Sequence, residues 1–140
     1  MGSESNYIYL YGKEYTRGLQ NVDTKLGKIN GVLATAKHYI GDGSTMHGAN
    51  QGDARIHGWA SYVSQNSQGY KGAIASEVGS VMASYSAING IPSSINSYYL
   101  LNVLRQDLGF GGLIVSDYDQ FSNNKLIQMH WPILDYPQAL

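Results

Sequence analysis

The sequence predicts an α/β fold built around a parallel β-sheet. Three short apolar runs, at residues 31–36, 80–85 and 112–116, are separated by segments with helical spacing. The first run begins at a glycine and shows no apolar–polar alternation, which is typical of a strand covered on both faces. Helices that alternate with strands in this way form right-handed βαβ units, and the strands of such units lie parallel.

The first helix is expected over residues 7–20, because its apolar and tyrosine positions recur every three or four residues: Tyr7, Leu10, Tyr11, Glu14, Tyr15, Gly18 and Leu19. A polar loop at 21–30 leads to the first strand. The long polar stretch at 41–58 is predicted to be a loop, and loops of this length inside compact domains are usually functional. A short helix is expected around 70–76, before the second strand.

The second strand is followed by a turn at residues 89–92 and then by a helix that Asn96 or Ser97 can cap. Gly109 is expected to end this helix. Its apolar face consists of Tyr99, Leu100, Val103, Leu104 and Leu108. After the third strand the chain is irregular until a possible helix start at Pro137.

Length and composition exclude several classes of protein. The chain has 140 residues, enough for one domain, and its formal net charge of −1 gives no basic face for nucleic acid. It has no cysteine, so disulfides and cysteine–zinc sites are excluded. No apolar stretch reaches the roughly 18 residues of a membrane span. The histidines lack a close metal-binding spacing and no phosphate-binding loop is present, so we predict neither a metal nor a cofactor.

Polar side chains follow the apolar runs at the point where each run ends. Lys37 and His38 follow the first run, Tyr85 closes the second, and Asp117 follows the third. The carboxyl ends of parallel strands lie at one edge of a sheet, and in (β/α) barrels this edge carries the active site. We therefore expect these four side chains to gather at one edge.

Three sequence blocks carry a family resemblance: AKHYIGDGST at 36–45, VMASYSAING at 81–90 and LGFGGLIVSDY at 108–118. With these blocks in this order, the chain resembles glycoside hydrolase family 3, the group of β-glucosidases and β-glucan exohydrolases. The resemblance covers about residues 7–119, and residues 120–140 diverge from it. It implies part of a (β/α)8 barrel, and a complete barrel needs about 250 residues. Residues 1–140 are therefore expected to form a single partial N-terminal domain with about three of the eight units.

The resemblance implies a retaining, exo-acting β-glucosidase of carbohydrate metabolism, and it assigns a role to each matching residue. Asp117 matches the catalytic nucleophile, within Ser-Asp-Tyr where the family more often has Ser-Asp-Trp. Lys37 and His38 match the pair that binds sugar hydroxyls in the −1 subsite. Tyr85 matches a tyrosine close to the nucleophile, and Gln51 falls where some relatives have a second polar sugar contact.

The chemistry agrees with these residue types. A retaining glycosidase uses one carboxylate as nucleophile and a second carboxyl about 5–5.5 Å away as acid. Lys37 and His38 are neighbours, and neighbours in a regular strand point to opposite faces of the sheet. Both can reach one sugar only if the backbone departs from regular strand geometry, so we predict an irregular backbone at this dipeptide.

The acid is expected outside this chain. In the family it usually lies in a second domain, beyond the segment that matches here, and no glutamate in this sequence takes its place. One subgroup, the β-N-acetylglucosaminidases, uses an Asp–His pair in the loop after the Lys-His motif, where this chain has Asp42 and His47. The Gly-Asp-Gly-x-Thr pattern of this loop favours the glucosidase type instead.

We therefore expect a fragment or truncated product with little or no activity alone. Its expected partners are a β-glucoside or oligosaccharide, the remainder of the barrel and a second domain, with no nucleic acid and no membrane. Proteins of the family are usually secreted, periplasmic or lysosomal. Two alternatives stay open: a catalytically silent carbohydrate-binding or assembly piece, and a barrel that binds another small ligand at the same edge.

Overall fold

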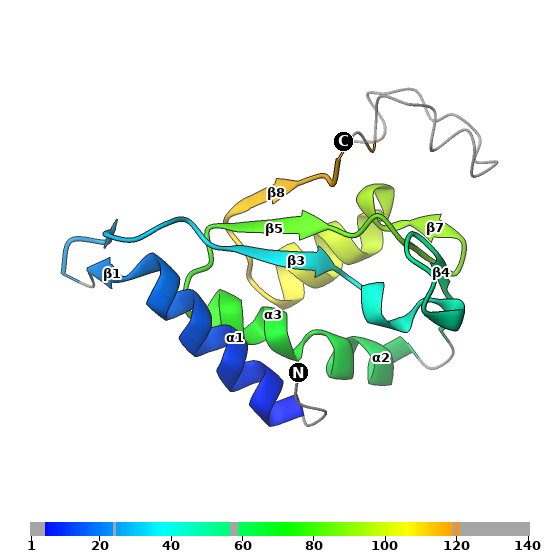
Figure 1. Ribbon diagram of the computed structural model, residues 1–140, viewed down its shortest axis with the longest axis horizontal. Coiled ribbons are helices and arrows are strands. Elements are labelled where there is room, and N and C mark those ends of the chain that lie inside the picture. The colour runs from blue at the N-terminus through cyan, green and yellow to red at the C-terminus, as the bar shows by residue number, and fades with distance from the viewer. Residues whose placement is uncertain (1–4, 24, 57–58, 119, 121–140) are drawn as a thin grey trace.

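Three parallel strands form the central sheet of the computed structural model, which describes residues 5–23, 25–56, 59–118 and 120. The strands are β3 (Thr35–Tyr39), β5 (Ser80–Ala83) and β8 (Leu113–Val115), in the order β3-β5-β8 (Figure 1). Both pairings are parallel. The predicted α/β fold with a parallel sheet is therefore confirmed, and it is the arrangement expected for part of a (β/α)8 barrel.

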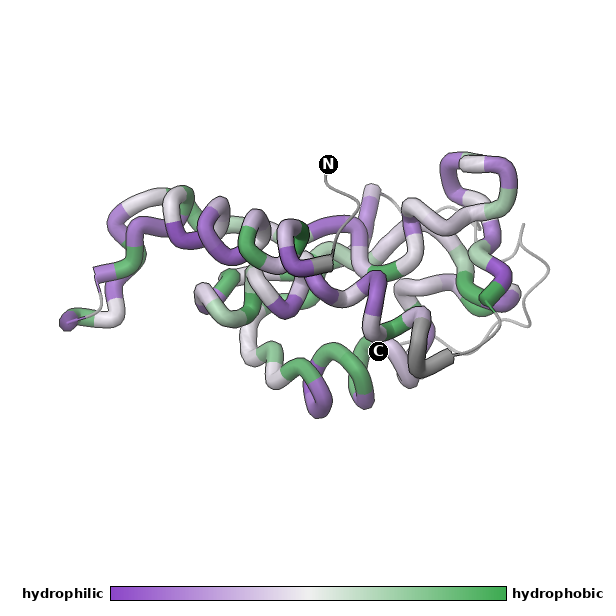
Figure 2. Tube along the Cα trace, turned by 90° about the horizontal axis from the view of Figure 1, so that it is seen from below, coloured by the Kyte–Doolittle hydropathy of each residue, from purple (hydrophilic) through white to green (hydrophobic). Residues whose placement is uncertain are grey.

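In the described part of the chain, the sheet is accompanied by the helices α1 (Ser5–Gln20), α2 (Trp59–Asn66), α3 (Gln68–Ala75) and the π-helix η4 (Tyr98–Asp107). Figure 1 shows α1 and α3 packed against each other beneath the sheet. The predicted helix at 7–20 is confirmed, whereas α2 was not predicted. Along these helices hydrophilic and hydrophobic stretches alternate (Figure 2). None of the helices within the described residues is long and apolar enough to cross a membrane.

The last helix follows its predicted signals at both ends. The Asn96 side-chain oxygen accepts a hydrogen bond from the Tyr99 backbone N–H, 3.4 Å away. Near the other end the Leu108 N–H donates to the Val103 carbonyl, five residues back, as in a π-helix. Gly109 then takes a left-handed φ of 69°, which suits a glycine after a helix. The predicted helix start at Pro137 lies outside the described residues.

Helices α1 and α3 meet through glycine. A β-carbon added to Gly72 would overlap the Tyr9 carbonyl oxygen, and one added to Gly12 would overlap the Gly69 carbonyl oxygen. The two helix backbones therefore touch directly, and only glycine allows this approach. This contact fixes how closely α1 lies beside α3.

Two parts of the chain predicted as loops contain short strands. In the stretch at 21–30, β1 (Val22–Asp23) pairs with β2 (Lys28–Ile29), so the prediction of a plain polar loop is wrong there. The Asp23 carboxylate accepts hydrogen bonds from the Lys25 and Leu26 N–H groups and so closes the turn between the two strands. This turn chemistry is typical of aspartate.

The long segment after β3 is also more ordered than its polar composition indicates. It contains the 3-10 turns η1 (Asp42–Ser44) and η2 (Met46–Gly48) and the strand β4 (Asp53–Ala54). A second sheet joins β4 to β6 (Ala87–Ile88), and β6 to β7 (Ile91–Pro92) through the turn predicted at 89–92. The short 3-10 turn η3 (Ser93–Ile95) then leads to η4. The loop at 41–58 is thereby attached to the chain that follows β5.

The first strand begins later than the apolar run at 31–36 predicts. The Gly31 and Val32 N–H groups donate to the Gln20 and Leu19 carbonyls at the end of α1, so this part of the run lies against the helix. The strand β3 consequently begins at Thr35 and includes Lys37 and His38, which were expected after its end.

The backbone at Lys37 and His38 is irregular, as predicted. The Lys37–His38 and Tyr39–Ile40 peptide bonds are cis. The pairing of β3 with β5 shifts in register between Ala36 and Tyr39, so the regular alternation of side chains is interrupted at the dipeptide.

A cluster of tyrosines lies within the largely aliphatic core. The Tyr39 side chain is fully buried, and its hydroxyl donates a hydrogen bond to the Tyr99 carbonyl at 3.1 Å. The Tyr70 ring packs edge-on against Tyr39, with 4.9 Å between ring centroids. Burial raises the pKa of Tyr39 above the usual range of a phenol, and the neighbouring Tyr70 and Tyr99 raise it further.

A buried amide joins three elements at the amino ends of the strands. The Gln20 side chain is fully buried at the end of α1. Its oxygen accepts the N–H of Ala34, just before β3, at 3.1 Å and the N–H of Gly79, just before β5, at 2.9 Å. Its amino group donates to the Glu77 carbonyl at 2.9 Å. One side chain thus aligns a helix with two neighbouring strands.

We expect Gln20→Ala to lower the free energy of unfolding by about 2–4 kcal/mol, because it leaves one buried and one partly buried backbone N–H group without an acceptor. Urea unfolding followed by circular dichroism measures the change. Gln68→Ala is the matched control, since the Gln68 amide makes one exposed hydrogen bond, to the Ser64 carbonyl. A Gln20→Ala variant as stable as the control would contradict the proposed alignment.

Stability should also fall at alkaline pH, and Tyr39 should contribute to the loss. A buried phenol keeps its proton in the folded state, whereas an unfolded tyrosine releases it near pH 10. The protonated Tyr39 phenol therefore contributes fully to the free energy of unfolding below about pH 10. Above that pH its contribution declines by about 1.4 kcal/mol per pH unit. Urea unfolding from about pH 8 to pH 11 should show a shallower decline for Tyr39→Phe. Tyr7→Phe, at a mostly exposed ring, is the control, and equal slopes for wild type and Tyr39→Phe would contradict the prediction.

Candidate active site

Two carboxylates and a histidine meet at the carboxyl edge of the main sheet. His38 comes from the irregular part of β3, Asp42 begins η1, and Asp117 follows β8 by two residues. The His38 Nε2 atom lies 3.7 Å from Asp117 Oδ2, and its Nδ1 atom lies 3.1 Å from Asp42 Oδ2. The imidazole therefore stands between the two carboxylates. His38 and Asp117, 79 positions apart in the sequence, are brought together, as expected for the ends of parallel strands.

Asp117 is held by the residues that follow it. The Tyr118 N–H donates to Asp117 Oδ1 at 2.6 Å, so Oδ2 is the oxygen that faces His38. The Asp117 N–H donates to the Gln120 side-chain oxygen at 3.3 Å, and the Gln120 amino group donates to the Ser84 carbonyl at 3.1 Å. Because Gln120 is buried, this amide ties the chain after β8 to the chain after β5.

Asp42 is connected to the chain after β5 by a second set of hydrogen bonds. Its Oδ1 atom accepts from the hydroxyls of Ser84 at 3.3 Å and Ser86 at 3.2 Å. Both serines are fully buried. Burial raises the pKa of Tyr70, and the Asp42 carboxylate raises it further. The Asp42 carboxylate thus binds the two serine hydroxyls through Oδ1 and contacts His38 through Oδ2.

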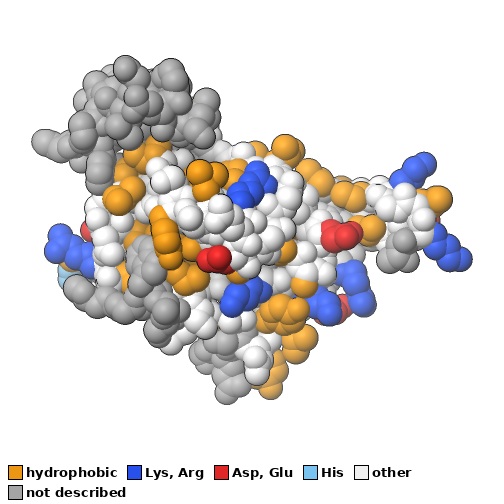
Figure 3. Space-filling model, turned by 180° about the vertical axis from the view of Figure 1, so that it is seen from behind, with side chains coloured by type: hydrophobic (Ala, Val, Ile, Leu, Met, Phe, Trp, Pro, Cys, Tyr) orange, Lys and Arg blue, Asp and Glu red, His pale blue; other side chains and the backbone are white. Residues whose placement is uncertain are grey.

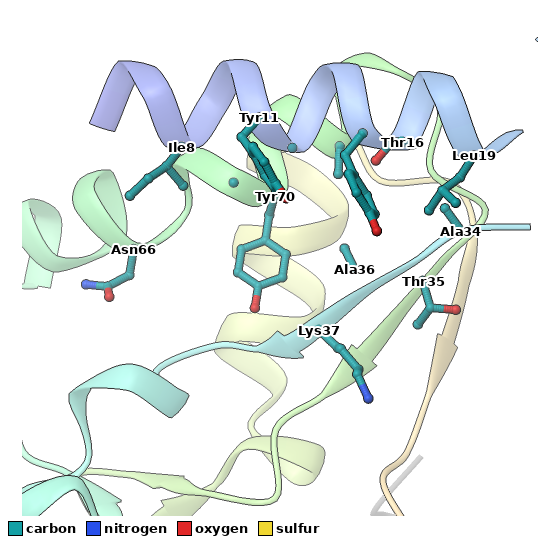
Figure 4. A pocket seen from close by; sticks show the side chains of 14 residues that line it. Ile8, Tyr11, Thr16, Leu19, Ala34, Thr35, Ala36, Lys37, Asn66 and Tyr70 are labelled. Atoms are coloured by element: carbon teal, nitrogen blue, oxygen red, sulfur yellow. The ribbon is translucent and has the colours of Figure 1, made fainter. Parts of the chain in front are cut away.

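The other predicted site residues are Lys37 within β3, Tyr85 after β5 and Gln51 before β4 of the second sheet. Lys37 is exposed in β3, and Figure 4 shows its side chain directed away from α1 and Tyr70. Tyr85 is half-buried between the two serines that bind Asp42. Gln51 is exposed ahead of β4 with a left-handed φ of 61°. The contacts described above bring His38 beside Asp117. The roles assigned to all five predicted site residues, Asp117, Lys37, His38, Tyr85 and Gln51, stay predictions.

The Asp–His pair of the alternative mechanism was Asp42 with His47. In the structure Asp42 Oδ2 contacts His38, and its Oδ1 is engaged by the two serines. His47 lies in η2 with a left-handed φ of 58°. The arrangement of Asp42 therefore favours a role beside His38.

Sequence reasoning missed the residues that hold the site. Ser84 and Ser86 stand two positions apart on either side of Tyr85, a spacing that could have indicated a shared direction. Gln120 carries no comparable signal, because its role depends on how the chain turns after Asp117.

A cavity of about 350 Å³ lies between α1, α3 and β3 (Figure 4). Its lining is largely apolar and includes Ile8, Tyr11, Tyr15, Leu19, Ala36 and Tyr70. Several of these side chains belong to the exposed face of α1. Neither His38 nor Asp117 lines the cavity, whereas Lys37 does, so the cavity adjoins β3 but is a different feature from the polar site formed by His38 and Asp117.

Enzymes built on (β/α) barrels carry their active sites at the carboxyl edge of the parallel sheet, which is where Asp117 faces His38 in this chain. The particular family follows from comparison with known proteins. The model of the glycosyl hydrolase family 3 N terminal domain matches residues 1–140, so the chain belongs to this family of glycosidases.

Relatives and solved structures agree with this assignment. The chain is 33% identical over 121 residues to a beta-xylosidase of Formosa agariphila, covering 83% of this chain and 16% of that protein. It is 38% identical over 122 residues to a probable exo-1,4-beta-xylosidase of Aspergillus clavatus, covering 81% and 15%. The exo-1,3/1,4-beta-glucanase ExoP of a Pseudoalteromonas species superposes with a TM-score of 0.77 at 34% identity, covering 84% and 15%. The chain thus spans about one sixth of the length of the curated relatives it matches.

Proposed function

We propose that this chain supplies the nucleophile and part of the sugar-binding site of a retaining, exo-acting β-glucosidase. The observation that carries the proposal is the approach of His38 Nε2 to Asp117 Oδ2, 3.7 Å apart at the carboxyl edge of the sheet. Membership of a glycosidase family supports it independently. The proposal assigns to Asp117 the attack on the sugar and to Lys37 and His38 the binding of its hydroxyls.

The proposed reaction begins at Asp117 Oδ2, the oxygen that faces His38. Because the Tyr118 N–H binds Oδ1, the proposal assigns the attack on the anomeric carbon to Oδ2. A bond forms between this oxygen and the sugar, the glycosidic C–O bond breaks, and the leaving oxygen takes a proton from a general acid. Water then hydrolyses the glycosyl ester and restores the carboxylate. Hydrogen bonds from Lys37 and His38 that strengthen in the transition state would lower its barrier.

The general acid is proposed to come from another part of the whole protein. Asp42 is the carboxylate beside His38, but it accepts hydrogen bonds at both oxygens, which suits an anchoring role and not proton donation to a leaving group. The relatives are about six times longer than the segment matched here, which leaves ample chain to supply an acid.

The remainder of the barrel is proposed to cover the exposed face of α1 and the apolar cavity. Tyr7, Leu10, Tyr11 and Tyr15 are each more than half exposed on this helix. Within the described residues, β3 pairs on one edge alone, with β5. Apolar side chains also reach the surface at several places on the rear of the molecule (Figure 3). Further βα units would cover such surfaces in a closed barrel.

A β-xylosidase is the second candidate, and one observation favours it. The relatives of 33% and 38% identity described above are named as xylosidases, whereas the solved structures include glucanases and glucosidases. A xyloside lacks the hydroxymethyl group of a glucoside, so the two candidates differ in one substituent of the sugar ring.

Covalent labelling should test the nucleophile. With 2-deoxy-2-fluoro-β-glucosyl fluoride, we expect Asp117 to gain one fluoroglucosyl group, because fluoride leaves without protonation and the fluorine at C2 slows hydrolysis of the ester. Peptide mass spectrometry locates the label, and Asp117→Asn should abolish it. Asp53→Asn, at an aspartate that binds the Gly90 N–H in the second sheet, should label like wild type.

The alternatives give different results in the same assay. Faster labelling by the corresponding xylosyl fluoride would assign the site to a β-xylosidase. Binding of glucose without any label would favour the catalytically silent carbohydrate-binding piece. A label that persists in Asp117→Asn would contradict the role of Asp117.

The isolated chain should hydrolyse an unactivated alkyl β-glucoside no faster than the Asp117→Asn variant, because such a leaving group requires an acid. Glucose release measured with a coupled assay tests this expectation. An aryl β-glucoside has a better leaving group that depends less on an acid, so Asp117-dependent hydrolysis of it by the chain alone would contradict the expectation of little or no activity.

A further inference from the structure

Asp42 links the histidine of the site to the central strand. It lies four residues after His38, and its Oδ2 atom is 3.1 Å from His38 Nδ1. On its other side, Oδ1 accepts from the hydroxyls of Ser84 and Ser86, which follow β5. The Ser84 hydroxyl oxygen also accepts the backbone N–H of Ser86 at 3.1 Å, and this hydrogen bond holds the Ser84 hydroxyl in place. The Asp42 carboxylate is therefore held by two buried serine hydroxyls on the side away from the imidazole.

These contacts decide which nitrogen of His38 carries a hydrogen. An ionised carboxylate only accepts hydrogen bonds, so the contact at Oδ2 requires an N–H at Nδ1. The hydrogen bond made by one ring nitrogen sets the tautomer of a neutral imidazole. With Nδ1–H directed at Asp42, Nε2 is the atom presented to Asp117, 3.7 Å from its Oδ2.

The orientation of the ring depends on the same contact. The His38 side chain is 31% exposed, so surrounding atoms do not enclose it fully. A partly exposed ring keeps rotational freedom unless a hydrogen bond restrains it. Asp42 provides this restraint, and the fully buried Ser84 and Ser86 in turn prevent the carboxylate from turning away.

We propose that Asp42 is a positioning residue, which fixes the tautomer and the orientation of His38 so that Nε2 faces Asp117 and the sugar bound there. The part that concerns the sugar rests on the proposed function. The tautomer and the ring orientation do not, because they follow from contacts within this chain.

The test uses the ring nitrogens of His38 as the probe. Long-range ¹H–¹⁵N spectra of the ¹⁵N-labelled chain, recorded at a pH at which imidazoles are neutral, distinguish the two tautomers, and His38→Gln identifies the signals. We expect the Nδ1–H form in wild type. In Asp42→Ala the ratio of Nδ1–H to Nε2–H should fall about tenfold or more, as expected for loss of a hydrogen bond to a charged group. Asp53→Asn is the control with the same loss of charge elsewhere.

A conservative variant keeps the test decisive if Asp42→Ala does not fold. Asp42→Asn preserves the shape and one oxygen, and serine hydroxyls can turn to accept from its amino group. It should give an intermediate tautomer ratio, because a neutral acceptor binds more weakly than a charged one. An Nε2–H tautomer in wild type, or a ratio unchanged in Asp42→Ala or Asp42→Asn, would overturn the proposal.

The consequence for the reaction is measured separately. Labelling of Asp117 by the fluoroglucosyl fluoride should slow about tenfold to a hundredfold in Asp42→Ala, as expected when a binding group is misplaced. An unchanged labelling rate would overturn the positioning role toward the sugar. If wild type is not labelled at all, the proposed glucosidase fails, while the tautomer spectra still decide whether Asp42 positions His38.

Discussion

The buried amide of Gln20 is the constraint on which the rest of this structure depends. It accepts the backbone N–H groups that precede β3 and β5, so two neighbouring strands start from one fixed point at the end of α1. A side chain with both a donor and an acceptor can satisfy backbone groups of three segments at once. Because parallel strands run in the same direction from this point, their opposite ends also lie close together.

At those opposite ends, polar side chains again connect neighbouring segments. Asp42 joins the chain after β3 to the serines after β5, and Gln120 joins the chain after β8 to the Ser84 carbonyl. Ser84 therefore belongs to both connections. The distance between His38 and Asp117 thus depends on the middle strand of the sheet, although β5 contributes neither of these two side chains.

Sequence patterns predicted the elements whose signals are local. The helical spacing at residues 7–20 predicted α1, and the glycine-bounded apolar run before Asp117 predicted β8. The order of the apolar runs predicted the parallel sheet. The start of β3 was misplaced because residues 31–34 are held by α1, which a local pattern does not contain. The approach of His38 to Asp117 could be predicted, because both residues lie at or near the carboxyl ends of parallel strands. The partners of Asp42 depend on loop conformation, and sequence spacing alone does not determine it.

The glycine contact between α1 and α3 limits how this part of the molecule can change. The helix backbones are in direct contact at Gly12 and Gly72. Any side chain introduced there would overlap the facing backbone and push the helices apart. The close spacing of α1 and α3 therefore requires glycine at these two positions. Insertions are more readily accommodated in the loops beyond the strands, where they leave this helix pair undisturbed.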